Sequence, residues 1–149
     1  MTTHKRALLI ESSLILAATV AAVVGMIHLK DYVNRSEAMR AITHLGDLIL
    51  DHRQKHGSLP PPSFVDNAKG DLEGAARMGR IRYRALWIGP NASDETILAY
   101  SRKRHPSSFL KDGYVVLYLD GRVEWLPSPQ FEGLLAGQQT PAEGQMTEK

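Results

Sequence analysis

The chain has 149 residues and a formal net charge of +2, so it has room for one compact domain with an appendage and shows no charge excess that would indicate a polyanionic partner. Cysteine is absent, which excludes disulfide frameworks, thiolate zinc sites and a cysteine nucleophile.

A basic leader, residues 1–6, precedes a long apolar stretch, residues 7–29. At about 1.5 Å per helical residue, this stretch is long enough to cross a hydrocarbon core of about 30 Å. We therefore predict a transmembrane segment. A cleaved secretory signal is the alternative, because a basic start, an apolar middle and small residues fit that pattern too. Retention is favoured because the apolar run continues past Ala22 without a clean A-x-A site and Glu11 interrupts it. Because basic residues flank both ends of this segment, their distribution does not determine its orientation in the membrane.

Beyond the apolar stretch the pattern becomes amphipathic without a break. Apolar residues recur at three- and four-residue intervals from Tyr32 to Ile49, with charged residues largely between them. No proline occurs before Pro60. We predict one helix from about residue 6 to about residue 56, which ends at Gly57 and the prolines that follow.

Residues 57–79 are rich in Pro, Gly, Asp and Asn, and we predict a loop there, with a short helical piece at 71–78. A sheet is expected over residues 80–126. Its strands are predicted at 81–88 and 96–100, followed by a hairpin at 114–126.

The dipeptide Asp120-Gly121 predicts the turn of this hairpin, because Asp-Gly is preferred in two-residue type I′ turns. Such a turn fixes the register of the two strands. The expected pairs are Leu119–Arg122, Tyr118–Val123, Leu117–Glu124 and Val116–Trp125. One face of the hairpin is then apolar or aromatic and suits a core; its members are Tyr114, Val116, Tyr118, Val123 and Trp125.

The simplest partner for that face is the amphipathic half of the long helix. We therefore expect an α+β fold, with a long N-terminal helix packed on a small antiparallel sheet of three or four strands. The domain would cover residues 30–136, with one short helix after the sheet, and residues 137–149 are expected to form a disordered polar tail.

This plan resembles the type IV pilins and the pseudopilins of type II secretion. The N-terminal signature of that family ends in an apolar pair and a glutamate, which Leu9-Ile10-Glu11 matches. A second resemblance is to bacterial pseudopilin-like proteins with a Leu-Pro-rich helix exit and a C-terminal Asp-Gly hairpin. Residues 58–62, 97–100 and 119–125 carry it, so the similarity covers most of the chain in short motifs.

The resemblance implies an assembly role for Glu11. In the family, the equivalent acid is thought to attract the amino terminus of a neighbouring subunit as it joins the fibre. A prepilin peptidase cuts after a glycine and methylates the new amino terminus, but here Arg6 occupies that position. Lys5 and Arg6 of a neighbour could replace the amine. The alternative is that Glu11, close to the bilayer edge, is protonated or snorkels to the headgroups.

Two other groups of residues are candidates for binding sites. His52 and His56 have the i, i+4 spacing of metal ligands but lack an assured third ligand, so a solvated helix end is expected and no metal. Two basic groupings could form a nucleic-acid patch, but no nucleic-acid motif accompanies them, and solvation or attraction to lipid headgroups is favoured. Their members are Arg77, Arg80, Arg82 and Arg84, and Arg102, Lys103, Arg104, His105 and Lys111.

No catalytic motif is present, so we expect neither an enzyme nor a cofactor nor a small-molecule substrate. The function expected is that of a structural pseudopilin or minor-pilin-like subunit in the bacterial inner membrane. Its head, the domain of residues 30–136, would lie in the periplasm. Its partners would be itself or other pseudopilins, which it would contact through the N-terminal helix. The alternative is a single-pass anchored binding module that binds an envelope partner or DNA and does not polymerise.

Overall fold

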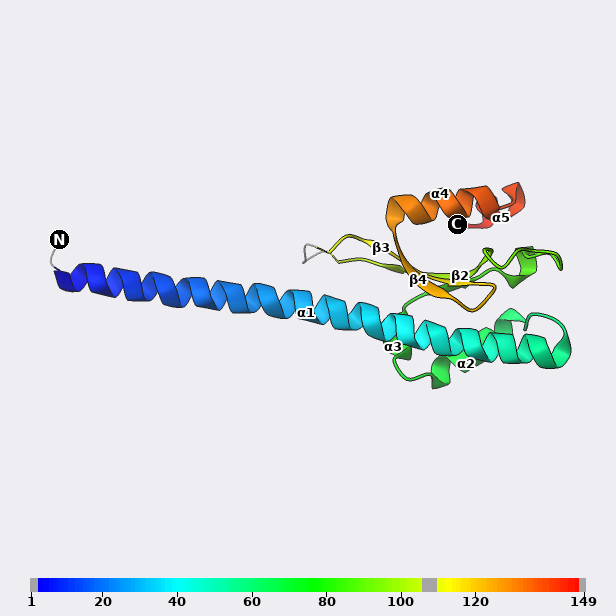
Figure 1. Ribbon diagram of the computed structural model, residues 1–149, viewed down its shortest axis with the longest axis horizontal. Helices are drawn as coiled ribbons and strands as arrows, with labels where there is room; N and C mark the ends of the chain where they lie inside the picture. The colour runs from blue at the N-terminus through cyan, green and yellow to red at the C-terminus, as the bar shows by residue number, and fades with distance from the viewer. Residues whose placement is uncertain (1–2, 106–109, 148–149) are drawn as a thin grey trace.

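In a computed structural model, which describes residues 3–105 and 110–147, the chain begins with one very long helix. Helix α1 runs from Thr3 to His56 and has 54 residues, which corresponds to about 80 Å. About half of it extends beyond the rest of the molecule (Figure 1). It ends where Gly57 takes a positive φ of 73° and its N–H donates to the carbonyl of Arg53 at 2.8 Å. The predicted single helix is confirmed.

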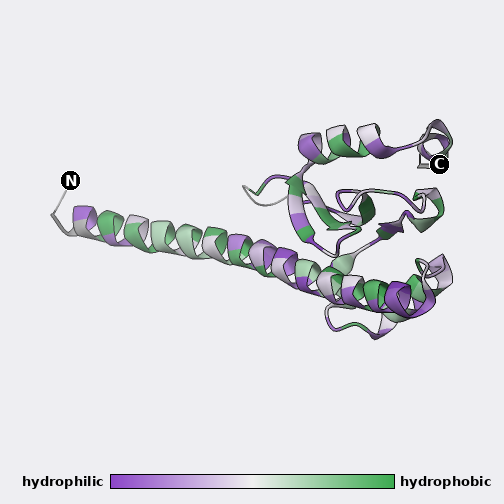
Figure 2. Cartoon of the chain, turned by 45° about the vertical axis from the view of Figure 1, so that its right-hand side comes forward, coloured by the Kyte–Doolittle hydropathy of each residue, from purple (hydrophilic) through white to green (hydrophobic). Residues whose placement is uncertain are grey.

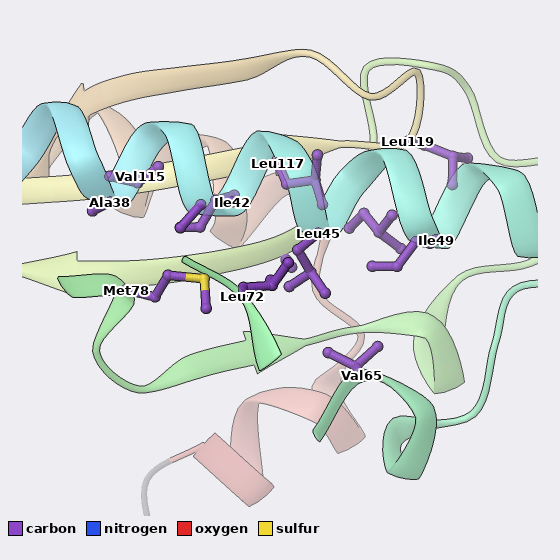
Figure 3. Close-up of a cluster of buried hydrophobic side chains, with 13 residues drawn as sticks. Ala38, Ile42, Leu45, Ile49, Val65, Leu72, Met78, Val115, Leu117 and Leu119 are labelled. Carbon is purple, nitrogen blue, oxygen red and sulfur yellow. The ribbon is translucent and has the colours of Figure 1, made fainter. Parts of the chain in front are cut away.

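The second half of α1 packs on the sheet through one apolar stripe. Ala38, Ile42, Leu45 and Ile49 are fully buried and follow the three- and four-residue spacing of a helix face. Figure 3 shows them against three sheet-side residues, Val115, Leu117 and Leu119. The predicted α+β fold, a long N-terminal helix on an antiparallel sheet, is therefore confirmed.

The sheet is an antiparallel meander in the order β1-β2-β3-β4. Its strands are β1 (Ile81–Tyr83), β2 (Ile97–Lys103), β3 (Gly113–Tyr118) and β4 (Val123–Pro127). Strand β2 confirms the strand predicted at 96–100 and extends it. The strand predicted at 81–88 is shorter than expected, because the backbone of Arg84 leaves the extended region and a 3₁₀ turn, η1 (Ala85–Trp87), follows.

The predicted register of the hairpin is wrong by one residue. Val115 pairs with Trp125 and Leu117 with Val123. The turn is a three-residue loop, in which the Gly121 N–H donates to the Tyr118 carbonyl at 3.0 Å and the Tyr118 N–H donates to the Arg122 carbonyl at 2.9 Å. Only Gly121 has a positive φ, so the turn is not type I′.

The shift exchanges the two faces of β3. The side chains of β3 that meet α1 are Val115 and Leu117. Tyr114, Val116 and Tyr118, which were expected there, lie on the opposite face. Val123 and Trp125 of β4 do lie on the α1 side, as expected. The three-residue loop buries Leu119 against α1, and this contact favours the observed register over the predicted one.

The other face of the sheet is covered by helix α4 (Ser128–Gln138), which confirms the short helix expected after the hairpin. Phe131 and Leu135 of α4 are buried against Val116 and Leu126. Phe131 also stacks on Tyr114, with ring centroids 3.9 Å apart. The sheet therefore lies between α1 and α4 (Figure 1). Apolar side chains pack on both of its faces.

Two stretches hold more helix than the sequence indicated. The predicted loop 57–79 contains α2 (Pro62–Asp71) and α3 (Ala75–Met78), and α2 begins at a proline, which suits the first turn of a helix. The expected disordered tail contains α5 (Pro141–Thr147). Glu143 of α5 is buried in an ion pair with Arg84, which holds this segment on the domain.

Candidate assembly surface

Residues 8–26, which make up most of the first half of α1, are exposed throughout. Their apolar side chains are largely exposed, as Leu14 at 69% and Ile15 at 66% illustrate. The most apolar window of α1 has a mean hydropathy of 2.1, and none of that window is buried. Figure 2 shows this half as predominantly hydrophobic. Within the described residues, α1 is the one helix long and apolar enough to cross a membrane.

Glu11 is an exposed carboxylate on this apolar surface. Nearby hydroxyl groups are satisfied within the helix: Ser13 donates to the Ile10 carbonyl at 2.8 Å and Thr19 to the Ile15 carbonyl at 2.9 Å. Glu11 itself makes no hydrogen bond or ion pair to another residue that the structure describes. The carboxylate is therefore left to solvent, to lipid headgroups or to groups of another molecule.

Lys5 and Arg6 are exposed about a turn and a half before Glu11, and the structure does not bring them together with it. The separation of five and six residues places them away from the side of the helix that Glu11 occupies, since neighbours on one face are three or four residues apart. The carboxylate and the two cations are therefore available to another copy of the helix.

A group of four residues, which we name the neck, joins the head to α1 where the apolar half ends: Asp31, Arg35, His105 and Trp125. The Arg35 guanidinium lies 4.4 Å from the Trp125 ring centroid, and the rings of His105 and Trp125 are 5.7 Å apart. Nδ1 of His105 lies 3.8 Å from a carboxylate oxygen of Asp31. These contacts fix the direction in which α1 leaves the domain. No local pattern in the sequence signals them.

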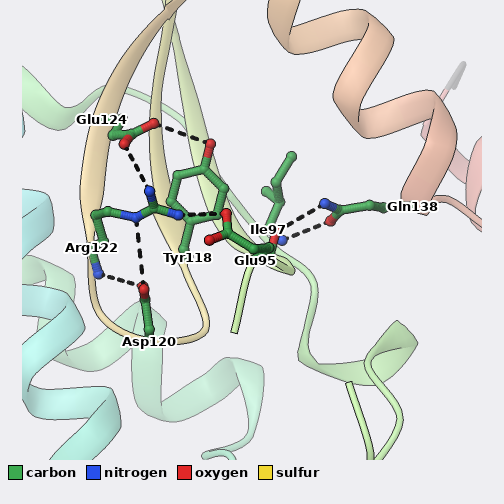
Figure 4. Close-up of polar contacts among 7 residues, drawn as sticks. All are labelled: Glu95, Ile97, Tyr118, Asp120, Arg122, Glu124 and Gln138. Carbon is green, nitrogen blue, oxygen red and sulfur yellow. Dashed lines mark hydrogen bonds and ion pairs between the residues drawn. The ribbon is translucent and has the colours of Figure 1, made fainter. Parts of the chain in front are cut away.

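The turn residues Asp120 and Gly121 have a structural role. Asp120 accepts a hydrogen bond from the Arg122 N–H at 2.9 Å. Arg122 in turn bridges Glu95 at 2.6 Å and Glu124 at 3.1 Å, and lies over the Tyr118 ring (Figure 4). The hydrogen bond to Glu95 is the main cause that raises the pKa of Arg122. These contacts order the tip of the hairpin.

His52 and His56 lie together near the end of α1. Their ring centroids are 4.3 Å apart, and His52 also packs on Phe64 at 4.9 Å. Among the described residues, no group of three or more His, Cys, Asp or Glu side chains is arranged to hold a metal. The two imidazoles pack against each other at a tilt, and His52 also packs on α2 through Phe64.

The two basic groupings do not form one patch. Arg84 is buried with Glu143 and His105 is buried in the neck, so neither faces solvent. Arg77 lies 3.2 Å from Glu37, and the Lys103 ammonium donates to the Arg77 carbonyl. Burial, followed by the charge of Arg77, lowers the pKa of Lys103. The members of the two groupings that stay exposed are Arg77, Arg80, Arg102, Arg104 and Lys111.

Searches against protein-family models, curated proteins and solved structures found no significant match to the chain.

Proposed function

We propose that this protein is a pseudopilin or minor-pilin-like subunit of a type II secretion or type IV pilus-type apparatus. In this proposal α1 is embedded in the bacterial inner membrane by its first half, and the head lies in the periplasm. The protein acts through helix-to-helix assembly, without catalysis, a cofactor or a small-molecule substrate.

The proposal rests mainly on the first half of α1, whose apolar side chains are exposed and which contains a single acidic residue, Glu11. A simple anchor needs only apolar length, but this one carries Glu11, a carboxylate of a kind that costs about 3 kcal/mol at the centre of a bilayer and less near its edge. Helices that pack together in a membrane can stabilise such a group by supplying an opposite charge. The cations Lys5 and Arg6 of a neighbouring copy, displaced along the helix axis, would supply it.

The rigid connection to the head supports the same role. Helix α1 continues from the apolar half into the core without interruption, and the neck holds its exit direction. A subunit that is displaced along its helix on joining an assembly therefore moves its head by the same distance. The alternative, a stand-alone anchored binding module, needs neither the acid nor this rigid connection.

Co-purification of two differently tagged copies from detergent-solubilised membranes tests the proposal. We expect the copies to co-purify, and Glu11→Ala in both to reduce recovery by about tenfold, the equivalent of about 1.4 kcal/mol. Asp47→Ala, which removes an exposed carboxylate from the head half of α1, is the matched control and leaves recovery unchanged. Equal recovery with and without Glu11 contradicts the proposal.

Intact-mass analysis of the membrane-extracted protein separates the proposal from its alternative. A methylated chain that begins at Ala7 establishes pilin-type processing, and the new amine then replaces Lys5 and Arg6 as the partner of Glu11. An unprocessed chain beginning at Met1 or Thr2 favours the anchored module unless the copies also co-purify. A chain that begins after Ala22 contradicts both.

A further inference from the structure

A groove of about 500 Å³ lies at the end of the head, where α1 ends and the chain turns into α2. Its apolar walls come from the α1–α2 connection, from η1 and the residues after it, and from the hairpin loop. Its apolar lining includes Leu59, Pro60, Leu86, Ile88 and Leu119. Leu86 is 79% exposed on its rim, although it is a large apolar side chain. Concave and mostly apolar surfaces of this kind are the usual form of binding sites.

The groove carries a single positive charge on an otherwise apolar lining. Among the described residues that line it, Arg53 is the only charged one, and Ser58 is the only other with a polar side chain. Arg53 forms no ion pair with any described carboxylate. The closest acid along the helix, Asp51, is already bonded to Lys55 at 2.7 Å. The groove therefore presents an apolar floor and one free guanidinium, a residue well suited to bind a carboxylate.

We propose that this groove docks an extended apolar peptide segment of another protein that carries an Asp or Glu side chain. The apolar residues would cover Leu86 and Ile88, and the carboxylate would pair with Arg53. The prolines of the wall, Pro60 to Pro62 and Pro90, hold its backbone in place, so less conformational entropy is lost on binding.

The position of the groove argues against other occupants. Arg53 lies about 35 Å along α1 from residue 29, where the apolar stretch ends. With that stretch in a bilayer, the groove is far above the lipid surface, so a lipid headgroup does not reach it. The described C-terminal segment, α4 and α5, lies across the sheet from α1 (Figure 1), so it does not fill the groove either.

This inference goes beyond the proposed assembly role, because the groove and Glu11 lie at opposite ends of α1. A random-peptide phage library, selected on the full-length protein in detergent and counter-selected on Leu86→Asp, tests it. We expect enriched sequences that combine apolar residues with Asp or Glu. Synthetic copies of these peptides should bind Leu86→Asp and Arg53→Glu at least about tenfold more weakly than the wild type.

Matched controls separate the groove from general effects. Leu134→Asp changes another exposed leucine, 41% exposed on α4, and Arg40→Glu reverses an exposed arginine elsewhere on α1. Both should leave peptide binding unchanged. Replacing the peptide's acid by Lys should weaken binding to the wild type and restore binding to Arg53→Glu. The inference is overturned if the selection enriches no sequences, or if the enriched sequences lack acidic residues. It is also overturned if the control variants lose as much peptide binding as Leu86→Asp and Arg53→Glu, or if a photo-crosslinker at position 86 reacts only with a second copy of the chain.

Discussion

The guanidinium of Arg84 and the carboxylate of Glu143 form a bidentate ion pair between the start of the sheet and the C-terminal segment. The two contacts measure 2.6 and 2.9 Å, and both side chains are almost fully buried. Arg84 also donates to the carbonyls of Ile97 at 2.7 Å and Gln138 at 3.1 Å. The pair therefore joins β1, β2 and the segment after α4 at one point.

Replacing Glu143 by Gln should destabilise the head by about 3–5 kcal/mol, because it leaves the Arg84 charge buried without its partner. Urea unfolding followed by tryptophan fluorescence measures this. The control is Glu132→Gln, which alters an exposed carboxylate on the neighbouring α4 and should change stability little. Equal effects of the two substitutions would show that α5 contributes no stability through this pair.

Gly121→Ala should destabilise the head by about 1–3 kcal/mol, because Gly121 has a φ of +90° that other residues adopt only with strain. A Cβ there would also lie 2.6 Å from the Leu50 side chain of α1. Gly133→Ala, in α4 with open space around it, is the control and should be neutral or slightly stabilising. A midpoint in urea that is unchanged for Gly121→Ala would contradict the observed turn.

Tyr83 should make the stability of the head sensitive to alkaline pH. Burial raises the pKa of Tyr83 to about 12, and its hydroxyl donates to the Pro60 carbonyl at 3.0 Å. Since the pKa of an unfolded tyrosine is about 10, the stabilisation is complete below about pH 10 and is lost as the pH rises to about 12. Tyr83→Phe should lower the melting temperature at neutral pH but flatten its alkaline decline. Tyr32→Phe, which alters a tyrosine that is 65% exposed, is the control and should leave the alkaline decline of the melting temperature unchanged.

The sequence predicted α1, β2 and α4 well because their signals are local. The apolar spacing and the Gly57 stop define α1 within its own residues. The hairpin register failed because Asp120-Gly121 suits both a two-residue turn and a three-residue loop with glycine in the left-handed position. The alternation of apolar and polar side chains along β3 could not distinguish the two possible registers. Both faces of that strand are apolar, with Val115 and Leu117 under α1 and Val116 under α4.

The candidate assembly surface likewise combines features that have a local sequence signal with features that only tertiary contacts create. Glu11 was visible in the sequence because one acid stands out in an apolar run. The neck contacts and the Arg84–Glu143 pair could not be predicted, since they join residues far apart in the chain without a local pattern. The basic residues 77–84 and 102–111 looked alike in the sequence, and only their tertiary contacts separate the buried from the exposed ones.

Disulfide crosslinking in membranes tests the assembly proposal most directly, because the chain has no native cysteine. One tagged copy carries Leu8→Cys and a differently tagged copy carries Ser12→Cys, next to Glu11. Both positions are exposed and lie after the leader. We predict a mixed disulfide on oxidation that is lost when Glu11→Ala is introduced into both copies, with Val24→Cys in place of Ser12→Cys as a control that does not crosslink. A disulfide that forms equally well without Glu11, or none in the wild-type background, would contradict the proposal.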